Sequence, residues 1–156
     1  MIYIFTDGSS RGNPGKGGFG VVLISGPHRK ELSKGFKLTT NNRMELLAAI
    51  EGLECLKADG MEVTLVSDSK YVVDAVEKGW LTKWLRTNFA GGKKNADLWI
   101  RFSRAYKRHK VKMQWVKGHN GHPENERCDQ LAVAAAMGSN LLDDFGFLSE
   151  QNTLGL

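Results

Sequence analysis

The chain has 156 residues, of which 41% are hydrophobic and 25% charged, the size and composition of one ordinary globular domain. No apolar run approaches the roughly 18 residues of a membrane span, and the N-terminus lacks the regions of a signal peptide. Cys55 and Cys128 are too few for a disulfide framework. We therefore expect a cytoplasmic protein without membrane contact, acting as a monomer.

The charge is unevenly distributed along the chain. The formal net charge is +5 and the pI about 9.3, which by itself favours an anionic partner only weakly. Residues 70–94 hold six Lys or Arg against two acids, and residues 101–117 hold seven Lys or Arg and no acid. The middle of the chain therefore carries most of the positive charge.

The N-terminal part predicts three strands. Residues 1–7 alternate and are rich in Ile, Tyr and Phe. Residues 19–24 and 31–38 follow, separated by a Gly-Pro pair that is typical of a turn. We expect an antiparallel meander.

The period of the apolar residues changes after Asn42. Spacings of four, three and three predict a helix that ends before Gly60, through Leu46, Ile50, Leu53 and Leu56. The next predicted elements are a strand over residues 62–68, two short helices over 69–79 and 80–89, and a longer helix over 96–108. A strand over 110–116 and a last helix over 123–137, with Pro in its first turn, complete the order.

This order predicts an α/β fold. We expect a five-stranded mixed sheet, first an antiparallel meander and then parallel crossovers, with helices on both faces. Residues 1–140 would form the domain. Residues 141–156 show no strong pattern and are expected to be a partly disordered tail.

The stretch GNPGKGGFG, residues 12–20, contains a match to the dinucleotide fingerprint G-x-G-x-x-G. That fingerprint needs a helix directly after the glycines, so that the helix N-terminus meets the pyrophosphate. Here the run VVLI follows and predicts a strand. A dinucleotide cofactor is therefore not expected.

Two acids follow predicted strands at their carboxyl ends, where sites gather in open α/β sheets. Asp7 closes IYIFTD and Asp68 closes VTLVSD, so the carboxylates lie side by side if the two strands are parallel neighbours. Each residue also has a structural explanation, because Asp7 precedes Gly-Ser as in a turn and Asp68 could cap the following helix.

Two further acids are candidates. Glu45 stands three residues after Asn42, a capping-box arrangement that is compatible with a role as a ligand. Asp129 shares a predicted helix face with small apolar residues, Ala132, Val133 and Ala136. A buried acid on such a face needs compensation, which a cation would supply.

Four converging carboxylates would repel one another, by roughly 4 kcal/mol for each pair about 4 Å apart at an effective dielectric of about 20. Such a cluster is protonated in part or holds metal, and oxygen ligands favour Mg²⁺ or Mn²⁺. Two such ions about 4 Å apart suit in-line attack on a phosphodiester, and the sequence leaves open whether the site holds one ion or two.

The segment VKGHNGHPENERCD adds two histidines and a cysteine. A zinc site of His119, His122 and Cys128 is an alternative, although the spacing fits no standard pattern. His119 lies in a Gly-flanked loop that suits proton transfer or product release, whereas His122 is more simply a residue of the helix start.

Five motifs in order resemble ribonuclease H type 1, especially its bacterial form: IFTDGS, GNPGKGGFG, TTNNRMEL, SDSKYV and VKGHNGHPENERCDQLA. The resemblance runs from about Ile2 to Met137. It implies a ribonuclease H-like fold and cleavage of the RNA strand of RNA–DNA hybrids, with 5′-phosphate and 3′-hydroxyl products. It implies that the metal-binding catalytic carboxylates are those of Asp7, Glu45, Asp68 and Asp129, and that Glu45 also positions a ribose 2′-hydroxyl. It implies that His119 is a mobile catalytic histidine.

The resemblance also gives a role to the basic middle of the chain, as a protruding handle that grips the DNA strand. The substrate-binding positions that it implies are Asn13, Thr40, Asn41, Asn42, Lys70, Tyr71, Trp80, Lys83, Trp84 and Arg86. Aromatic faces suit sugar or base contacts and cations neutralise phosphates, while a packed Trp pair with a solvated charged face is the alternative for Trp80 and Trp84.

Two other functions are compatible with parts of the pattern. Another nuclease or strand-transfer enzyme of the same broad fold would share the acids but not the handle or the GHNGH loop. A non-catalytic nucleic-acid-binding domain would not need all four acids and His119. The expected partner is an RNA–DNA hybrid, recognised through backbone and sugar with little sequence selectivity.

Overall fold

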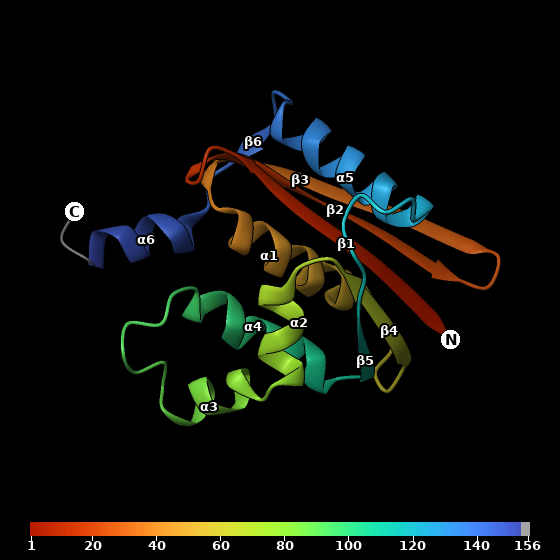
Figure 1. Ribbon diagram of the computed structural model, residues 1–156, viewed down its shortest axis with the longest axis horizontal. Helices are drawn as coiled ribbons and strands as arrows, with labels where there is room; N and C mark the ends of the chain where they lie inside the picture. Colours follow the sequence, from red (N-terminus) through yellow and green to blue (C-terminus); the bar gives the residue numbers. More distant parts are fainter. Residues whose placement is uncertain (154–156) are drawn as a thin grey trace.

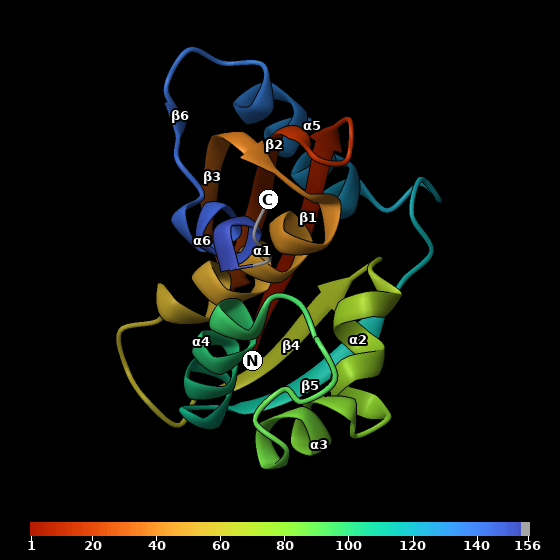
Figure 2. The same ribbon diagram turned by 90° about the vertical axis from the view of Figure 1, so that its left-hand side faces the viewer.

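The computed structural model describes residues 1–153 and contains one mixed sheet with helices on both faces (Figures 1 and 2). The strand order is β5-β4-β1-β2-β3-β6. The strands are β1 (Ile2–Arg11), β2 (Gly15–Ser25), β3 (His28–Thr39), β4 (Glu62–Ser67), β5 (Lys110–Trp115) and β6 (Leu141–Leu142). The helices are α1 (Asn41–Glu54), α2 (Lys70–Glu77), α3 (Trp80–Arg86), α4 (Ala96–Lys107), α5 (Pro123–Ala136) and α6 (Phe145–Thr153).

The first three strands form the predicted antiparallel meander, and β4 and β5 are added in parallel by helical crossovers. All three strands of the meander are longer than predicted. β2 begins at Gly15, so the glycines of the false dinucleotide fingerprint lie inside a strand and no helix follows them. This confirms the strand predicted after the glycines, in place of the helix that the dinucleotide fingerprint requires.

One face of the sheet is covered by one helix and the other face by several. Figure 1 shows α5 on one side and α1, α2 and α4 on the other. The main core lies on the second side, where Ile4, Leu65 and Ile50 are fully buried together with the ring of Trp99. Burial of these large apolar side chains supplies most of the driving force for folding.

The glycines of β2 and β3 let α5 approach the sheet closely. A Cβ atom on Gly20 would lie 2.3 Å from the backbone oxygen of Cys128, and one on Gly18 would lie 2.4 Å from that of Ala132. A Cβ atom on Gly35 would lie 2.1 Å from the oxygen of Ala135. Larger residues at these positions would push away the helix that carries Asp129.

The C-terminal segment corrects two expectations. Leu141 and Leu142 form a sixth strand beside β3, and α6 follows, so the sheet has six strands and residues 141–153 contain regular secondary structure. The sequence shows no period here because distant contacts hold the segment: Leu141 pairs with Gly35, and Asp144 with Arg43 of α1. The rest of the expected tail, residues 154–156, lies outside the described residues.

Among residues 1–153, no helix has the length and apolar character needed to span a membrane.

Candidate active site

Asp7 and Asp68 lie side by side because β1 and β4 are parallel neighbours. The last residues paired in register are Thr6 and Ser67, so each aspartate is one position beyond this pair. The prediction that Asp7 ends its strand is wrong, because β1 continues to Arg11, and the turn explanation fails for the same reason. The cap of α2 is the side chain of Ser69, which accepts from the backbone N of Val72, so Asp68 is free of that role.

Glu45 reaches the two aspartates because Gly8 has no side chain. A Cβ atom on Gly8 would lie 2.4 Å from the backbone N of Glu45, so the start of α1 packs directly on β1. The backbone N of Gly8 donates both to Asp7 Oδ1, at 2.9 Å, and to Glu45 Oε1. The capping-box interpretation of Glu45 is wrong, because Thr40 is the N-cap of α1 and its hydroxyl accepts from the backbone N of Arg43.

Asp7, Glu45 and Asp68 form a metal-compatible cluster. Each offers a carboxylate oxygen within 4.8 Å of the others, and Asp7 is only 8% exposed. Burial raises the pKa of Asp7 to about 7, a hydrogen bond with Glu45 opposes this, and the charges of Asp68 and Asp129 add to it. Burial and the charges of Asp7 and Asp68 also raise the pKa of Glu45 well above its ordinary value. Without a cation, these carboxyls therefore retain a proton near neutral pH.

Asp129 lies in the wall of the same pocket but outside this triad. The pocket is lined by residues of five segments, Asp7, Gly8, Ser9, Ser10, Asn41, Asn42, Glu45, Asp68, Ser69, His119 and Asp129. Asp129 is half-buried, whereas Ala132 and Ala136 of the predicted common face are fully buried. It stands at the edge of the packed face and lines the pocket, where its half-buried carboxylate keeps contact with solvent, which explains how the helix accommodates it.

The loop after β5 brings His119 into this pocket. His119 is exposed and has a left-handed backbone with φ of 55°. The loop passes close to Asp68, because a Cβ atom on Gly118 would lie 2.7 Å from Asp68 Oδ2. Trp115 anchors its start by donating from Nε1 to the backbone oxygen of Asp68, at 3.1 Å.

The structure contradicts the zinc alternative. Cys128 is fully buried under the sheet and its thiol donates to the backbone oxygen of Phe5 at 3.2 Å, while His119 and His122 are exposed. Burial raises the pKa of this thiol, which disfavours the thiolate that zinc needs. Within residues 1–153, the acidic triad is the one group with metal-ligand geometry.

The predicted groove residues at the start of α1 lie together. Asn13 Oδ1 accepts from the backbone N of Asn41 at 3.1 Å, which ties the β1–β2 turn to the helix. Asn41 and Asn42 are exposed and line the acidic pocket. A neighbouring pocket is lined by Asn13, Pro14, Thr40, Asn42, Lys94, Asn95, Phe147, Glu150 and Gln151.

Lys70 and Tyr71 at the start of α2 differ in whether their polar groups are free to contact a substrate. Lys70 is exposed, with its Nζ 4.8 Å from the centroid of the Trp115 ring. The hydroxyl of Tyr71 instead accepts from Asn95 Nδ2 and from Trp99 Nε1, both at 2.9 Å. Tyr71 therefore has an internal role that the sequence did not indicate, and its substrate contact stays a prediction.

The predicted handle, residues 80–94, carries a mixed aromatic and basic surface. Trp80 is 40% exposed and lies 6.4 Å from Trp84, centroid to centroid, while Trp84 packs against buried Trp99 at 5.6 Å. Lys83 and Arg86 are exposed on α3. The packed-pair alternative thus holds for Trp84, and Trp80 keeps a face open to solvent.

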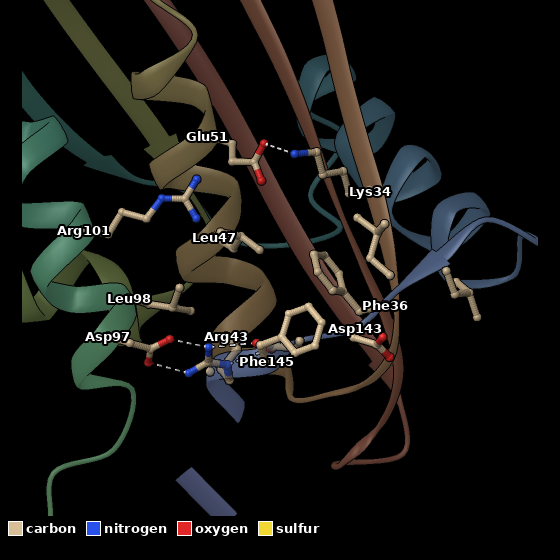
Figure 3. Close-up of a pocket in the computed structure, with 14 residues that line it drawn as sticks. Lys34, Phe36, Arg43, Leu47, Glu51, Asp97, Leu98, Arg101, Asp143 and Phe145 are labelled. Carbon is tan, nitrogen blue, oxygen red and sulfur yellow. Dashed lines mark hydrogen bonds and ion pairs between the residues drawn. The ribbon is translucent and has the colours of Figure 1, made fainter. Parts of the chain in front are cut away.

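Sequence reasoning missed Gly8 and Arg43. A glycine inside a strand pattern signals close backbone approach, which is the role of Gly8 beside Glu45. Arg43 is 1% exposed, and its guanidinium binds Asp97 and Asp144 beside a separate pocket that shares no residue with the acidic one (Figure 3). Its signal is a cation three and four residues before the apolar pair Leu46 and Leu47.

The family comparison agrees with this geometry. The family model described as RNase H matches residues 1–137. The chain belongs to the RNase H family. Proteins called ribonuclease H from Desulforamulus reducens and Aeromonas salmonicida are 58% and 52% identical to this RNase H chain, covering 90% and 94% of it and 90% and 96% of their own lengths.

Solved structures confirm the RNase H fold. The crystal structure of LC9-RNase H1, a type 1 RNase H with the type 2 active-site motif, is 32% identical, with a TM-score of 0.79 over 95% of this chain and 79% of that one. LC11-RNase H1 in complex with an RNA/DNA hybrid is 25% identical, with a TM-score of 0.67 over 87% and 96%. The α/β class and the resemblance expected from the sequence are thereby confirmed.

Proposed function

We infer that this chain is an endonuclease that hydrolyses phosphodiester bonds in the RNA strand of RNA–DNA hybrids. The observation that carries this is the triad of Asp7 inside β1, Glu45 on α1 and Asp68 after β4, in a chain of the RNase H family. A relative of the same fold crystallised with an RNA/DNA hybrid supports the substrate class.

The donor set fits Mg²⁺, with Mn²⁺ as a substitute. All candidate ligands are carboxylate oxygens, and the raised pKa values of Asp7 and Glu45 indicate a pocket whose charge calls for a cation. Asp7, Glu45 and Asp68 would hold one or two ions, and Asp129 would complete a shell. A bound ion would activate water for in-line attack and stabilise the leaving oxygen, giving 5′-phosphate and 3′-hydroxyl ends.

The surrounding residues would bind and orient the substrate. Asn41 and Asn42 beside the acids suit hydrogen bonds to ribose hydroxyls and to base edges, with little sequence selectivity. Lys83, Arg86 and the open face of Trp80 would hold the DNA strand. His119, exposed in its loop, would relay a proton or assist departure of the product. A monomeric state and a cytoplasmic location stay predictions.

Cleavage of labelled substrates with Mg²⁺ tests this function. We expect cleavage of the RNA strand of an RNA–DNA hybrid and none of duplex DNA or duplex RNA. Cleavage of duplex DNA would favour another nuclease of this fold, and binding without cleavage would favour a non-catalytic domain. Either outcome would overturn the proposal.

A further inference from the structure

The second basic segment of the chain, residues 101–117, has no role in the function proposed above. Two of its seven cations are neutralised, Arg101 by Glu54 at 2.6 Å and Arg108 by Asp59 at 2.7 Å. The other five are exposed and form no ion pair within residues 1–153: Arg104, Lys107, Lys110, Lys112 and Lys117. The charge that remains is therefore available to an external anion.

Two of these lysines share one face of an edge strand. β5 is the first strand of the sheet and has a neighbour, β4, on one side. Met113 of β5 is 7% exposed and belongs to the core under α2 and α4. Because side chains alternate along a strand, Lys110 and Lys112 point to the opposite face. On that face α5 packs mainly over β1, β2 and β3, which leaves the corner at β5 open (Figure 1).

The neighbours of Lys112 across the sheet are suited to contact with a nucleic acid. Lys112 is in register with Thr64, which is in register with Tyr3. Tyr3 is 42% exposed and stacks on Phe5, with centroids 6.3 Å apart. Glu62 lies beside Lys110 in register and forms no ion pair with it. The ring of Tyr3 on β1 and the two lysines on β5 thus face solvent on the same side of the sheet, while Thr64 between them is 6% exposed.

β5 runs from these lysines toward the end of the sheet that carries Asp68, because it is parallel to β4. Lys117 is two residues before His119, and Trp115, at the end of β5, is hydrogen-bonded to the backbone of Asp68. Lys110 and Lys112 are about 7 Å apart along the strand, and Lys110 stands about 17 Å from Trp115. At about 3.4 Å per base pair, this distance corresponds to about five base pairs of duplex.

We propose that Lys110, Lys112 and Lys117, the β5 lysine strip, bind the sugar–phosphate backbone of the substrate duplex where it extends beyond the active site. This deepens the function proposed above and rests on it. The strip is separate from the handle, which lies on α3 and the loop after it. Lysines bind phosphates as point charges without reading bases, and each neutralised phosphate releases a counterion. The strip would thus favour long substrates over short ones.

The test compares Lys110→Gln/Lys112→Gln with a control of equal charge change, Lys30→Gln/Lys57→Gln, whose lysines are also exposed and without ion pairs within residues 1–153. Two duplexes carry the same central block of ribonucleotides, one of about 6 and one of about 20 base pairs. We expect the strip variant to raise KM for the long duplex about tenfold with kcat unchanged, and to leave the short duplex unaffected. Lys110→Arg/Lys112→Arg should restore the affinity.

A second readout does not depend on cleavage. The salt dependence of metal-free binding to the long duplex should lose about two units of slope in the strip variant relative to the control. Equal salt slopes for the strip variant and the control, or equal losses of affinity on short and long duplexes, would overturn the proposal that the β5 lysine strip binds the duplex. If the unmodified protein binds but cleaves neither duplex, the proposed function fails, while the slopes still decide whether the strip contacts phosphate.

Discussion

Asp144 of the C-terminal segment and Arg43 of α1 form a buried bidentate ion pair, with Asp144 Oδ2 2.8 Å from Nε and Oδ1 2.9 Å from Nη2. The hydroxyl of Thr39 donates to the same carboxylate at 2.7 Å. Asp97 binds the other side of the guanidinium (Figure 3). Arg43 precedes Glu45 by two residues. The C-terminal segment is thereby fixed to the helix that carries Glu45 of the acidic triad.

Asp144→Ala should lower the free energy of unfolding by about 1.5 to 3 kcal/mol, because buried Arg43 loses its charge-assisted hydrogen bonds to Asp144 and keeps those to Asp97. Asp143→Ala is the matched control. Its carboxylate is 3.6 Å from exposed Lys37, and such surface pairs contribute about 0 to 1 kcal/mol. Urea unfolding of both variants measures the difference. Equal losses of unfolding free energy would show that the buried ion pair contributes no more to stability than the surface pair.

Asp7→Asn should abolish Mg²⁺-dependent cleavage of the hybrid, because an amide is a poorer metal ligand than the carboxylate that it replaces. Hybrid binding without metal should persist, since the handle and the groove asparagines are untouched. A gel assay for cleavage and a binding titration in chelator measure the two effects separately. Full activity of the variant would refute the assignment of Asp7.

The same substitution should stabilise the metal-free protein at high pH. Burial raises the pKa of Asp7 in the folded state to about 7 from the ordinary 3.8, so the folded protein holds a proton that the unfolded chain releases in this window. Stability of the unmodified protein therefore falls as pH rises from about 4 to 7. We expect Asp7→Asn to add about 1 to 4 kcal/mol at pH 8 and little near pH 4.

Unfolding in urea with chelator at both pH values measures this gain, and Asp143→Asn controls for the loss of one negative charge at a half-exposed site. A gain that is independent of pH would contradict the raised pKa of Asp7.

Gly20→Ala should destabilise the protein by about 1 to 3 kcal/mol, because the added methyl group overlaps the backbone oxygen of Cys128. Activity should fall with it, since α5 carries Asp129. Gly138→Ala is the control, because a Cβ atom there meets its nearest neighbours at an ordinary 3.4 Å. Thermal unfolding and cleavage rates compare the two, and a neutral Gly20→Ala would mean that α5 can shift without cost.

Lys83→Ala/Arg86→Ala should weaken hybrid binding and reduce its salt slope by up to about two units, because both cations are exposed on the handle. Binding measured at several salt concentrations, with Lys30→Ala/Lys57→Ala for comparison, checks this. An unchanged slope would show that these handle residues contact no phosphate.

Local patterns were sufficient to predict most of the fold. Alternation in β1, the change of apolar period at α1 and Pro123 at the start of α5 each depend on neighbours in the chain, and all three elements are present. Parallel pairing of β1 with β4, which places Asp7 beside Asp68, was left as a condition by the sequence, and the structure shows it. The sixth strand and α6 were missed because their contacts, such as that of Leu141 with Gly35, join distant residues.

The sequence by itself determined the family, the α/β class, the acidic and basic composition of the site and the absence of a dinucleotide loop, since these rest on residue order and local geometry. Tertiary structure alone decided which acids meet. Close packing at Gly8 brings Glu45 to the aspartates, while Asp129 stays in the pocket wall. Tertiary structure also decided that the Tyr71 hydroxyl is hydrogen-bonded to Asn95 and Trp99 and that Arg43 binds the C-terminal segment. Such hydrogen-bond partners and burial are set by packing between segments far apart in the chain.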